Sequence, residues 1–368
     1  MLLDPAKDIK IGTSGYSYAG LPPKGWYGAF YPEKKTKGFD ELKYYSQIFN
    51  TCEINNTFYR PPSEAVAKGW ATKTPPDFTF AIKVWQKFTH PMKISRKKSD
   101  EQWEAASQKD FDDFRAGILP LAEAGKLGAL LFQYPAGFRC SPENIEKVAS
   151  TLRSFYDYPK VVELRHESWS ENSPEMKALF LGNRASGVLI DEPKFATSIR
   201  QEPEAVGDIF YFRAHGRNAK AWWNAKESWE RYDYLYSRDE IKQHAERIKT
   251  AASMPGVQKA FAFYNNHARA NAAANAIMLS QELGVRLKAM PPEAIVTKFP
   301  ELVQGHRITT SYPRLNAVTV PKRQRVRARP SFERLLWIKS DLPAVKTPRR
   351  AHFLHDVQTL LFVAYRLR

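Results

Sequence analysis

Polar and charged side chains recur at the ends of short apolar runs in this chain. Three runs carry such residues two positions apart, and the pairs are Glu53 and Asn55, Glu163 and Arg165, and Arg213 and His215. Because side chains on a strand alternate between its two faces, the members of each pair share a face. Buried charges destabilise a fold unless they are paired or used in chemistry, so the runs predict a polar site.

The residue types in this set suit acid–base chemistry and the binding of an anion. The predicted catalytic residues are Glu53, Lys83, Glu163 and His215. The glutamates would exchange protons with a substrate, aided by the histidine, while Lys83 would partner a glutamate or offer an amine for a Schiff base. The predicted substrate-binding residues are Asn55, Tyr59, Gln133, Arg165, His166, Asp191, Arg213, Asn265 and Asn266.

The elements that must position these residues form a repeating pattern of strand, loop and helix. Apolar runs of strand length lie at 9–13, 51–55, 78–84, 128–133, 160–165, 187–191, 209–215 and 260–265. Helical patterns are expected at 39–49, 63–73, 101–124, 141–155, 174–181, 238–252 and 269–283, with a loop at 192–205. Eight strands alternating with helices predict a (β/α)8 TIM-like barrel. A doubly wound open sheet is the alternative, but it calls for a glycine-rich phosphate loop after the first strand.

The predicted polar residues fall where a barrel of this type forms its active site, at the carboxyl ends of the strands. We therefore favour a functional site. The structural alternative is a self-neutralising ion network, in which three acidic residues balance three basic ones. That network would join Glu53, Glu163 and Asp191 to Lys83, Arg165 and Arg213.

An anionic ligand suits the cations of this set better than a metal ion does. Arginine holds phosphate or carboxylate with two hydrogen bonds. Barrels often bind phosphate at the loops after the last two strands, here 213–218 and 265–270, and at a helix N-terminus. We expect no metal or other cofactor, because cations on the same rim would repel a divalent ion and the chain has no HxH or HExxH spacing.

The same segments resemble the domain of unknown function 72 (DUF72) family, also called YecE-like proteins. The resemblance runs in order from IGTSGYSY to FYNNHARANAAANA, roughly over residues 9–285. The segments are Ile11–Tyr18, Trp26–Pro32, Phe49–Pro62, Phe80–Val84, Leu130–Phe138, Val162–Trp169, Phe212–Gly216 and Phe263–Ala276. The resemblance implies a TIM-like barrel and no established activity. A link to metal-dependent barrels of the endonuclease IV type is an analogy of fold.

The net charge of +17 is concentrated toward the C-terminus. Residues 301–368 hold 14 Lys and Arg against 4 Asp and Glu, and the densest run is PKRQRVRAR at 321–329. Such a run predicts either an arm that binds nucleic acid or a solvated tail that binds nothing specific. We therefore divide the chain into a barrel domain, residues 1–290, and a basic C-terminal extension, residues 291–368.

The composition excludes several classes of protein. Hydrophobic residues make up 43% of the 368 residues, which is enough to build a sizeable core. The two cysteines, Cys52 and Cys140, cannot form a disulfide framework, and no apolar run approaches the roughly 18 residues of a membrane span. Without a secretory signal at the start, we expect a cytoplasmic protein and no membrane partner.

The favoured hypothesis is a metal-independent enzyme that uses glutamate acid–base chemistry on a small anionic ligand in the barrel mouth, either phosphorylated or nucleotide-like. Two alternatives stay open. One is a non-catalytic nucleic-acid-binding module that uses residues 321–329 for phosphates. The other is a metal-dependent phosphodiesterase like endonuclease IV.

Overall fold

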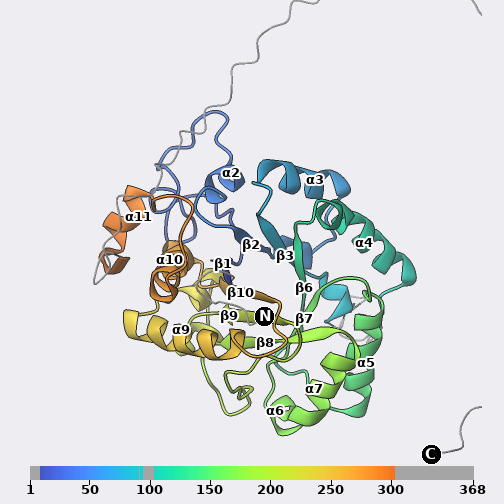
Figure 1. Cartoon of the computed structure of the whole chain (residues 1–368). Helices are drawn as coiled ribbons and strands as arrows, with labels where there is room; N and C mark the ends of the chain where they lie inside the picture. The colour runs from blue at the N-terminus through green and yellow to red at the C-terminus, as the bar shows by residue number, and fades with distance from the viewer. Residues whose placement is uncertain (1–8, 91, 94–102, 303–368) are drawn as a thin grey trace, which may run out of the picture. The chain divides into compact units, whose positions relative to one another are not determined.

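Eight parallel strands form the centre of the protein and wind into a nearly closed barrel, with helices around the outside (Figure 1). The structure is a computed structural model that describes residues 9–90, 92–93 and 103–302. The barrel strands are β1 (Ile9–Thr13), β2 (Thr51–Ile54), β3 (Thr79–Lys83), β6 (Leu127–Gln133), β7 (Lys160–Glu163), β8 (Ala185–Asp191), β9 (Ile209–Ala214) and β10 (Lys259–Tyr264). Each corresponds to one predicted run, so the (β/α)8 fold expected from the sequence is confirmed.

The barrel closes between β1 and β2 through a side chain and one short backbone contact. The Tyr45 hydroxyl lies between the two strands: it accepts a hydrogen bond from Thr13 N at 2.9 Å and donates one to Thr51 O at 3.1 Å. Gly12 permits this approach, because a Cβ at that position would lie 2.3 Å from Thr51 O. Gly15 N donates to Glu53 O at 2.7 Å, which brings the end of β1 beside the end of β2.

Most helices follow a barrel strand and begin at a residue that caps them. Serine side chains accept a backbone N–H at the starts of α3, α4, α5 and α9, and Asp40 does so for α2. The helices are α2 (Glu41–Tyr45), α3 (Glu64–Lys73), α4 (Gln108–Glu123), α5 (Pro142–Arg153), α6 (Ser168–Glu171), α7 (Ser173–Gly182), α8 (Ala219–Trp222), α9 (Arg238–Ala252), α10 (Asn271–Leu283) and α11 (Glu293–Lys298). Short 3₁₀ turns are η1 (Asn56–Phe58), η2 (Gln86–Phe88), η3 (Ser228–Tyr232), η4 (Ala268–Ala270) and η5 (Pro300–Leu302).

Two segments differ from a regular barrel. The helix expected from residue 101 begins at Gln108, because Trp103–Glu104 (β5) pairs in antiparallel fashion with Met92–Lys93 (β4). The segment between β8 and β9 carries no helix, as the sequence predicts. A cavity of about 330 Å³ opens beside this segment, lined in part by Phe180, Val188 and Ile199.

Packing of the barrel continues past residue 290. Ile295 on α11 and Leu302 in η5 are fully buried and belong to the same hydrophobic core as the barrel. Arg238 Nε donates to Glu301 O at 2.9 Å, which holds this end of the described chain against α9. Where a separate extension begins stays a prediction, and residues 321–329 lie outside the described residues. In the described part of the chain, no helix is both long and apolar enough to cross a membrane.

Candidate functional site

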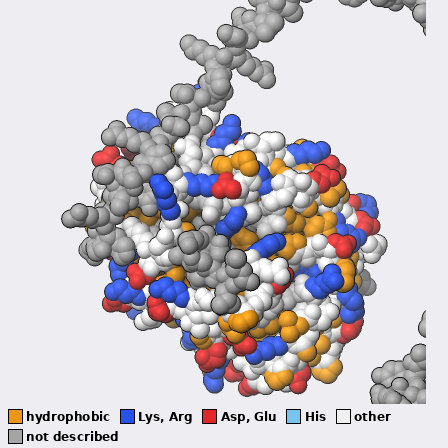
Figure 2. Space-filling view, viewed as in Figure 1, with side chains coloured by type: hydrophobic (Ala, Val, Ile, Leu, Met, Phe, Trp, Pro, Cys, Tyr) orange, Lys and Arg blue, Asp and Glu red, His pale blue; other side chains and the backbone are white. Residues whose placement is uncertain are grey.

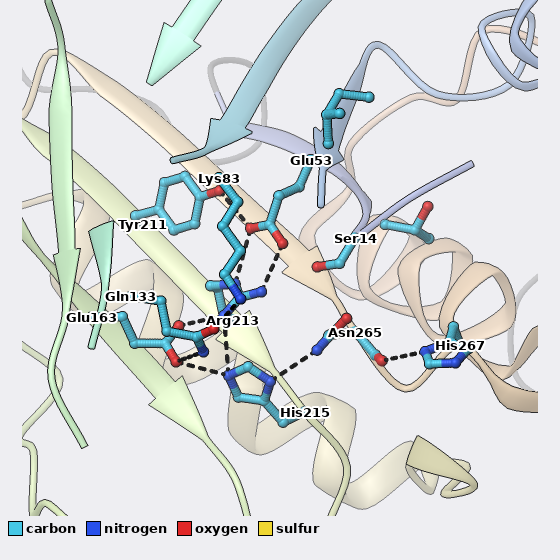
Figure 3. A network of polar contacts seen from close by, with 12 residues as sticks. Ser14, Glu53, Lys83, Gln133, Glu163, Tyr211, Arg213, His215, Asn265 and His267 are labelled. Carbon is cyan, nitrogen blue, oxygen red and sulfur yellow. Dashed lines mark hydrogen bonds and ion pairs between the residues drawn. The ribbon is translucent and has the colours of Figure 1, made fainter. Parts of the chain in front are cut away.

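A buried cluster of charges lies inside the barrel where the strands reach their carboxyl ends (Figure 3). Arg213 comes from β9 and lies between Glu53 of β2 and Glu163 of β7. Its Nε and Nη2 donate to the two carboxylate oxygens of Glu53 at 2.9 and 2.7 Å, and Nη1 donates to Glu163 Oε2 at 2.5 Å. Glu53 and Glu163 are fully buried, and Arg213 is 1% exposed. The guanidinium is therefore committed to two carboxylates, and the anion-binding role that we predicted for Arg213 does not fit this arrangement.

The cluster keeps both glutamates ionised. Burial alone would raise the pKa of Glu53, but the charge and hydrogen bonds of Arg213 outweigh burial and lower it. Burial would also raise the pKa of Glu163, but the charge of Arg213 and a hydrogen bond from His215 hold it well below its usual value. Carboxylates with lowered pKa are weak bases. Glu53 and Glu163 are therefore better suited to remain as permanent negative charges than to act as the general acid or base that the sequence suggested.

Tyr211 joins the floor of this cluster and was missed in the sequence. Its hydroxyl donates to Glu53 Oε2 at 2.7 Å and is buried. Tyr211 lies two residues before Arg213 on β9, so strand alternation could have placed both on the inner face.

Lys83, at the end of β3, has a neutral amide and a ring as its neighbours instead of a carboxylate. Its Nζ donates to Gln133 Oε1, and Gln133 Nε2 donates to Glu163 Oε1. Nζ also lies 3.9 Å from the centre of the Phe58 ring. Burial and the nearby charge of Arg213 lower the pKa of Lys83, the charges of Glu163 and Glu53 raise it, and the net result is a pKa of about 7. Lys83 is thus a group of the mouth that changes protonation near neutral pH.

His215 is held neutral beside the glutamate. Its Nδ1 accepts a hydrogen bond from Asn265 Nδ2 at 3.1 Å, and its Nε2 lies 3.3 Å from Glu163 Oε1. An accepting Nδ1 leaves the ring proton on Nε2, where it faces the carboxylate. Burial, opposed by the charge of Glu163, lowers the pKa of His215. The imidazole therefore orients Glu163 and carries no charge at neutral pH.

Arg165 is the arginine of the mouth that reaches solvent. Its Nε donates to Glu192 Oε2 at 3.0 Å and its Nη2 bonds to the same oxygen, while the side chain remains 17% exposed. Nη1 makes no hydrogen bond with any other described residue, and the guanidinium lies 5.6 Å from the centre of the Trp222 ring. Glu192 was missed in the sequence because it follows the end of β8.

Ser14, at the end of β1, offers an unused polar group to the same space. Its hydroxyl is buried close to the Glu53 carboxylate, whose pKa it helps to lower, but it makes no hydrogen bond of regular geometry with a described residue. Figure 3 shows it turned inward, between Glu53 and Asn265. Asn55 Oδ1 is likewise buried without a partner in the described chain. Buried polar atoms are usually satisfied, so these two favour a ligand or water that completes their hydrogen bonds.

Asp191 lies outside this cluster, which corrects the sequence prediction. Its carboxylate accepts hydrogen bonds from Arg217 Nε and Nη2 at 2.9 and 2.6 Å and from the Tyr236 hydroxyl at 2.8 Å. In the parallel pairing of β8 with β9, Asp191 is the partner of Ala214, whereas Ile190 is the partner of Arg213. The Asp191 side chain therefore lies on the outer face of the barrel, as that of Ala214 does. Its hydrogen bonds connect β8 to the segment that follows β9.

Three further predicted ligand-binding residues do not reach the cluster. His166 Nδ1 accepts from Ser168 N at 3.1 Å and so supports the start of α6. Asn266 Nδ2 donates to Tyr234 O at 2.7 Å and joins two loops. Tyr59 is 72% exposed, with its ring against Phe58. These residues follow the strands, where the alternation rule no longer applies.

The predicted phosphate position at the start of α10 already has a carboxylate beside it. Asp233 accepts from Arg269 Nε at 2.9 Å and from Asn271 Nδ2 at 3.3 Å. A negative side chain next to a helix N-terminus satisfies the positive end of the helix. The arrangement therefore moves the expected anion site away from α10.

The described residues contain no group of three or more His, Cys, Asp and Glu side chains placed to hold a metal ion. The carboxylates of the mouth are instead bound to arginines. Within this part of the chain, the hypothesis of an endonuclease IV-like metal centre therefore has no set of donors to support it.

Comparisons with known proteins agree on one family. The family model described as "Protein of unknown function DUF72" matches residues 10–298. UPF0759 protein YunF of Bacillus subtilis (strain 168) is 25% identical over 293 residues, which cover 76% of this chain and 98% of that protein. A crystal structure of a DUF72 family protein from Thermotoga maritima MSB8 is similar with a TM-score of 0.62 and 33% identity, over 75% of this chain and 99% of that one. A DUF72 family protein from Enterococcus faecalis V583 also gives a TM-score of 0.62, at 25% identity, over 76% and 96%.

Proposed function

The chain belongs to the DUF72 family of unknown function, and on this premise we propose that it is an enzyme that exchanges protons with a small anionic substrate through Lys83. The observation that most strongly supports this proposal is the environment of the Lys83 amine. It lies at the carboxyl end of a barrel strand, contacts a neutral amide, and has a pKa of about 7. A group whose pKa lies near the working pH is the most effective general acid or base.

The other residues of the mouth have supporting roles in this proposal. Glu163 stays ionised and holds Gln133, which in turn orients the Lys83 amine. His215 and Arg213 fix Glu163 from its other sides. The acid–base role assigned to glutamate from the sequence therefore passes to Lys83, and the glutamates set its electrostatic environment.

Arg165 is the proposed anchor for the negative group of the substrate. It is partly exposed, and its Nη1 has hydrogen-bonding capacity left after the contact with Glu192. One charge-assisted hydrogen bond contributes about 1.5–3 kcal/mol, so removing this anchor should weaken anion binding about 10- to 100-fold.

Calorimetric titration with a panel of small carboxylates and phosphate monoesters tests the anchor. The double variant Arg165→Gln with Glu192→Gln removes both charges of this pair, and Glu163, whose Oε1 lies 3.5 Å from Arg165 Nε, keeps Arg213 as its partner. The matched control is Arg153→Gln with Glu146→Gln, a pair on the surface of α5 with both side chains more than half exposed. We expect loss of binding in the first variant only. If both variants bind the small anions equally well, Arg165 does not anchor the substrate, and the proposal of an anionic substrate held by this residue is wrong.

Proton exchange is tested with pyruvate in D2O, followed by NMR of its methyl protons. We expect deuterium incorporation that depends on Lys83 and rises with pH through about 7, as the amine loses its proton. Lys83→Met should abolish the catalysed exchange. If a substrate of the panel is bound and processed with no dependence on Lys83, the amine is not the acid–base group.

The nucleic-acid module remains the second hypothesis. Its arm, residues 321–329, lies outside the described residues. On the face shown in Figure 2, Lys and Arg side chains are interspersed with Asp and Glu and do not gather into one basic field. This face therefore adds no support to that hypothesis beyond the composition of the chain.

A further inference from the structure

We propose that the Lys83 amine forms an imine with the carbonyl carbon of a small aldehyde or ketone that carries a carboxylate or phosphate. The inference rests on the proposed function, because it places the substrate in the same mouth. It goes further by naming a covalent intermediate and the carbonyl class of substrate.

The hydrogen bonding of Lys83 differs from that of the structural lysines in the barrel. Lys160 Nζ donates to three backbone carbonyls, each at 3.1 Å, and Lys126 Nζ donates to two carbonyls and a hydroxyl. Three such bonds use all three N–H groups of an ammonium ion, and the pKa of Lys160, which burial lowers to about 8, stays above that of Lys83. Lys83 has a single polar partner, the Gln133 amide oxygen, and no carboxylate within ion-pair distance among the described residues. Its nitrogen can therefore lose a proton without breaking an ion pair.

The position of the amine makes it reachable. Lys83 is partly exposed at the mouth, whereas Arg213 and Glu163 below it are buried. The Phe58 ring covers one side of Nζ. A lysine at the end of a barrel strand, in apolar and cationic surroundings, is the arrangement that activates an amine as a nucleophile.

The protonation state supports the same role. With a pKa of about 7, roughly half of the Lys83 side chains carry a neutral amine at pH 7. For a lysine at the ordinary value of about 10.4, the neutral fraction is lower by about 10³-fold. Addition to a carbonyl needs the nitrogen lone pair, so Lys83 should react far ahead of exposed lysines.

The reaction balances without an added oxidant or metal. The nitrogen lone pair forms a bond to the carbonyl carbon, and the carbonyl electron pair moves to oxygen, which takes a proton from the nitrogen. The resulting carbinolamine loses its hydroxyl and a second proton as water, which leaves a carbon–nitrogen double bond. Two unpaired polar atoms in the mouth, Ser14 Oγ and Asn55 Oδ1, are available for hydroxyl groups or water during these steps.

Borohydride trapping tests the imine directly on the full-length protein. Glyoxylate is the first probe, because it is the smallest aldehyde with a carboxylate and its size does not limit entry. Reduction of the imine adds the mass of the probe less one oxygen atom, and peptide mapping by mass spectrometry locates it. We expect labelling at Lys83 at pH 7 at least about 10-fold above any exposed lysine, with half-maximal labelling near pH 7.

Variants separate this inference from simpler explanations. Lys83→Arg keeps a positive charge without a nucleophilic amine and should lose the label. Lys68→Arg, on the exposed side of α3, is the matched control and should keep it. Circular dichroism checks that both variants are folded. Equal labelling of Lys83 and exposed lysines, or a label that persists in Lys83→Arg, overturns the imine.

The outcome is also distinguishable from failure of the proposed function. If pyruvate exchange depends on Lys83 but no adduct is trapped there, Lys83 acts as a base and only the imine is wrong. If an adduct forms at Lys83 but exchange is absent, the imine stands and the proton-exchange proposal fails.

Discussion

Replacement of Arg213 by methionine should destabilise the barrel strongly and change how its stability depends on pH. The guanidinium makes three charge-assisted hydrogen bonds to Glu53 and Glu163, and both carboxylates are fully buried. Breaking a buried ion pair by removing one partner costs about 3–5 kcal/mol. Since two carboxylates lose their partner at once, we expect a loss toward the upper end of that range.

The pH dependence gives a sharper test than the size of the loss. In the wild type the pKa values of both carboxyl groups are lowered. Their contribution is therefore complete above the unfolded value of about 4.3 and is lost as pH falls through the folded pKa. In Arg213→Met, burial is no longer opposed by the guanidinium, and the pKa of the carboxyl groups rises. The contribution of these two carboxyl groups to the stability of the variant should then be complete below about pH 4.3 and should be lost as pH increases through the raised pKa.

Urea unfolding at pH 5 and pH 8, followed by tryptophan fluorescence, measures both effects. We expect the wild type to gain stability from pH 5 to pH 8, because the lowered pKa of Lys83, about 7, leaves this buried amine mostly neutral at pH 8. Arg213→Met should gain less over the same range or lose stability. Adding Glu53→Gln and Glu163→Gln to the variant should remove the part of this difference that comes from the two carboxyl groups. Lys68→Gln, on the exposed side of α3, is the matched control, and it should change stability by less than about 1 kcal/mol, because an exposed ion pair such as Lys68 with Glu64 contributes little. A loss of less than about 1 kcal/mol in Arg213→Met, with the same pH dependence as the wild type, would refute the reasoning.

Two further predictions concern regions outside the central cluster. Asp191→Asn should lower the free energy of unfolding by about 1–3 kcal/mol, because the contacts with Arg217 and Tyr236 weaken, while the affinity for small anions in calorimetry stays unchanged. Loss of anion binding in that variant would show that the outward network reaches the mouth. Replacing the basic residues of 321–329 by glutamine in the full-length protein should weaken oligonucleotide binding at low salt and flatten its salt dependence, and unchanged binding would exclude that arm.

The strands could be predicted because each is an apolar run of strand length. The inner face of β9 could be predicted because polar residues interrupt its apolar run. Arg213 and His215 interrupt an apolar run at a spacing of two, so their common face follows from alternation. The sequence placed Glu53 and Glu163 with Arg213 only in the alternative of a self-neutralising ion network, and the structure contains both of these ion pairs. Glu53 is 160 positions away in the chain, and only closure of the barrel brings the two together.

Asp191 shows why the same rule fails on a strand buried on both faces. Val188, Leu189 and Ile190 are all apolar and all buried, so the run has no alternation from which to determine the inner face. The pairing with Ala214 determines it, and that pairing is a tertiary feature. Glu192, which pairs with Arg165, was missed for another reason: it follows the end of β8, where the alternation of a strand no longer applies.

The structural and functional interpretations of the buried charges are linked through Lys83. Burial and the charge of Arg213 lower the pKa of Lys83, while Glu163 and Glu53 raise it, and the balance falls at about 7. Those same two glutamates are held ionised by Arg213. The ion network therefore sets the charge felt by the amine, and a self-neutralising cluster need not exclude chemistry. Glu163 Oε1 also lies 3.5 Å from Arg165 Nε, so charges of both signs surround Lys83, and burial is the largest cause of its lowered pKa.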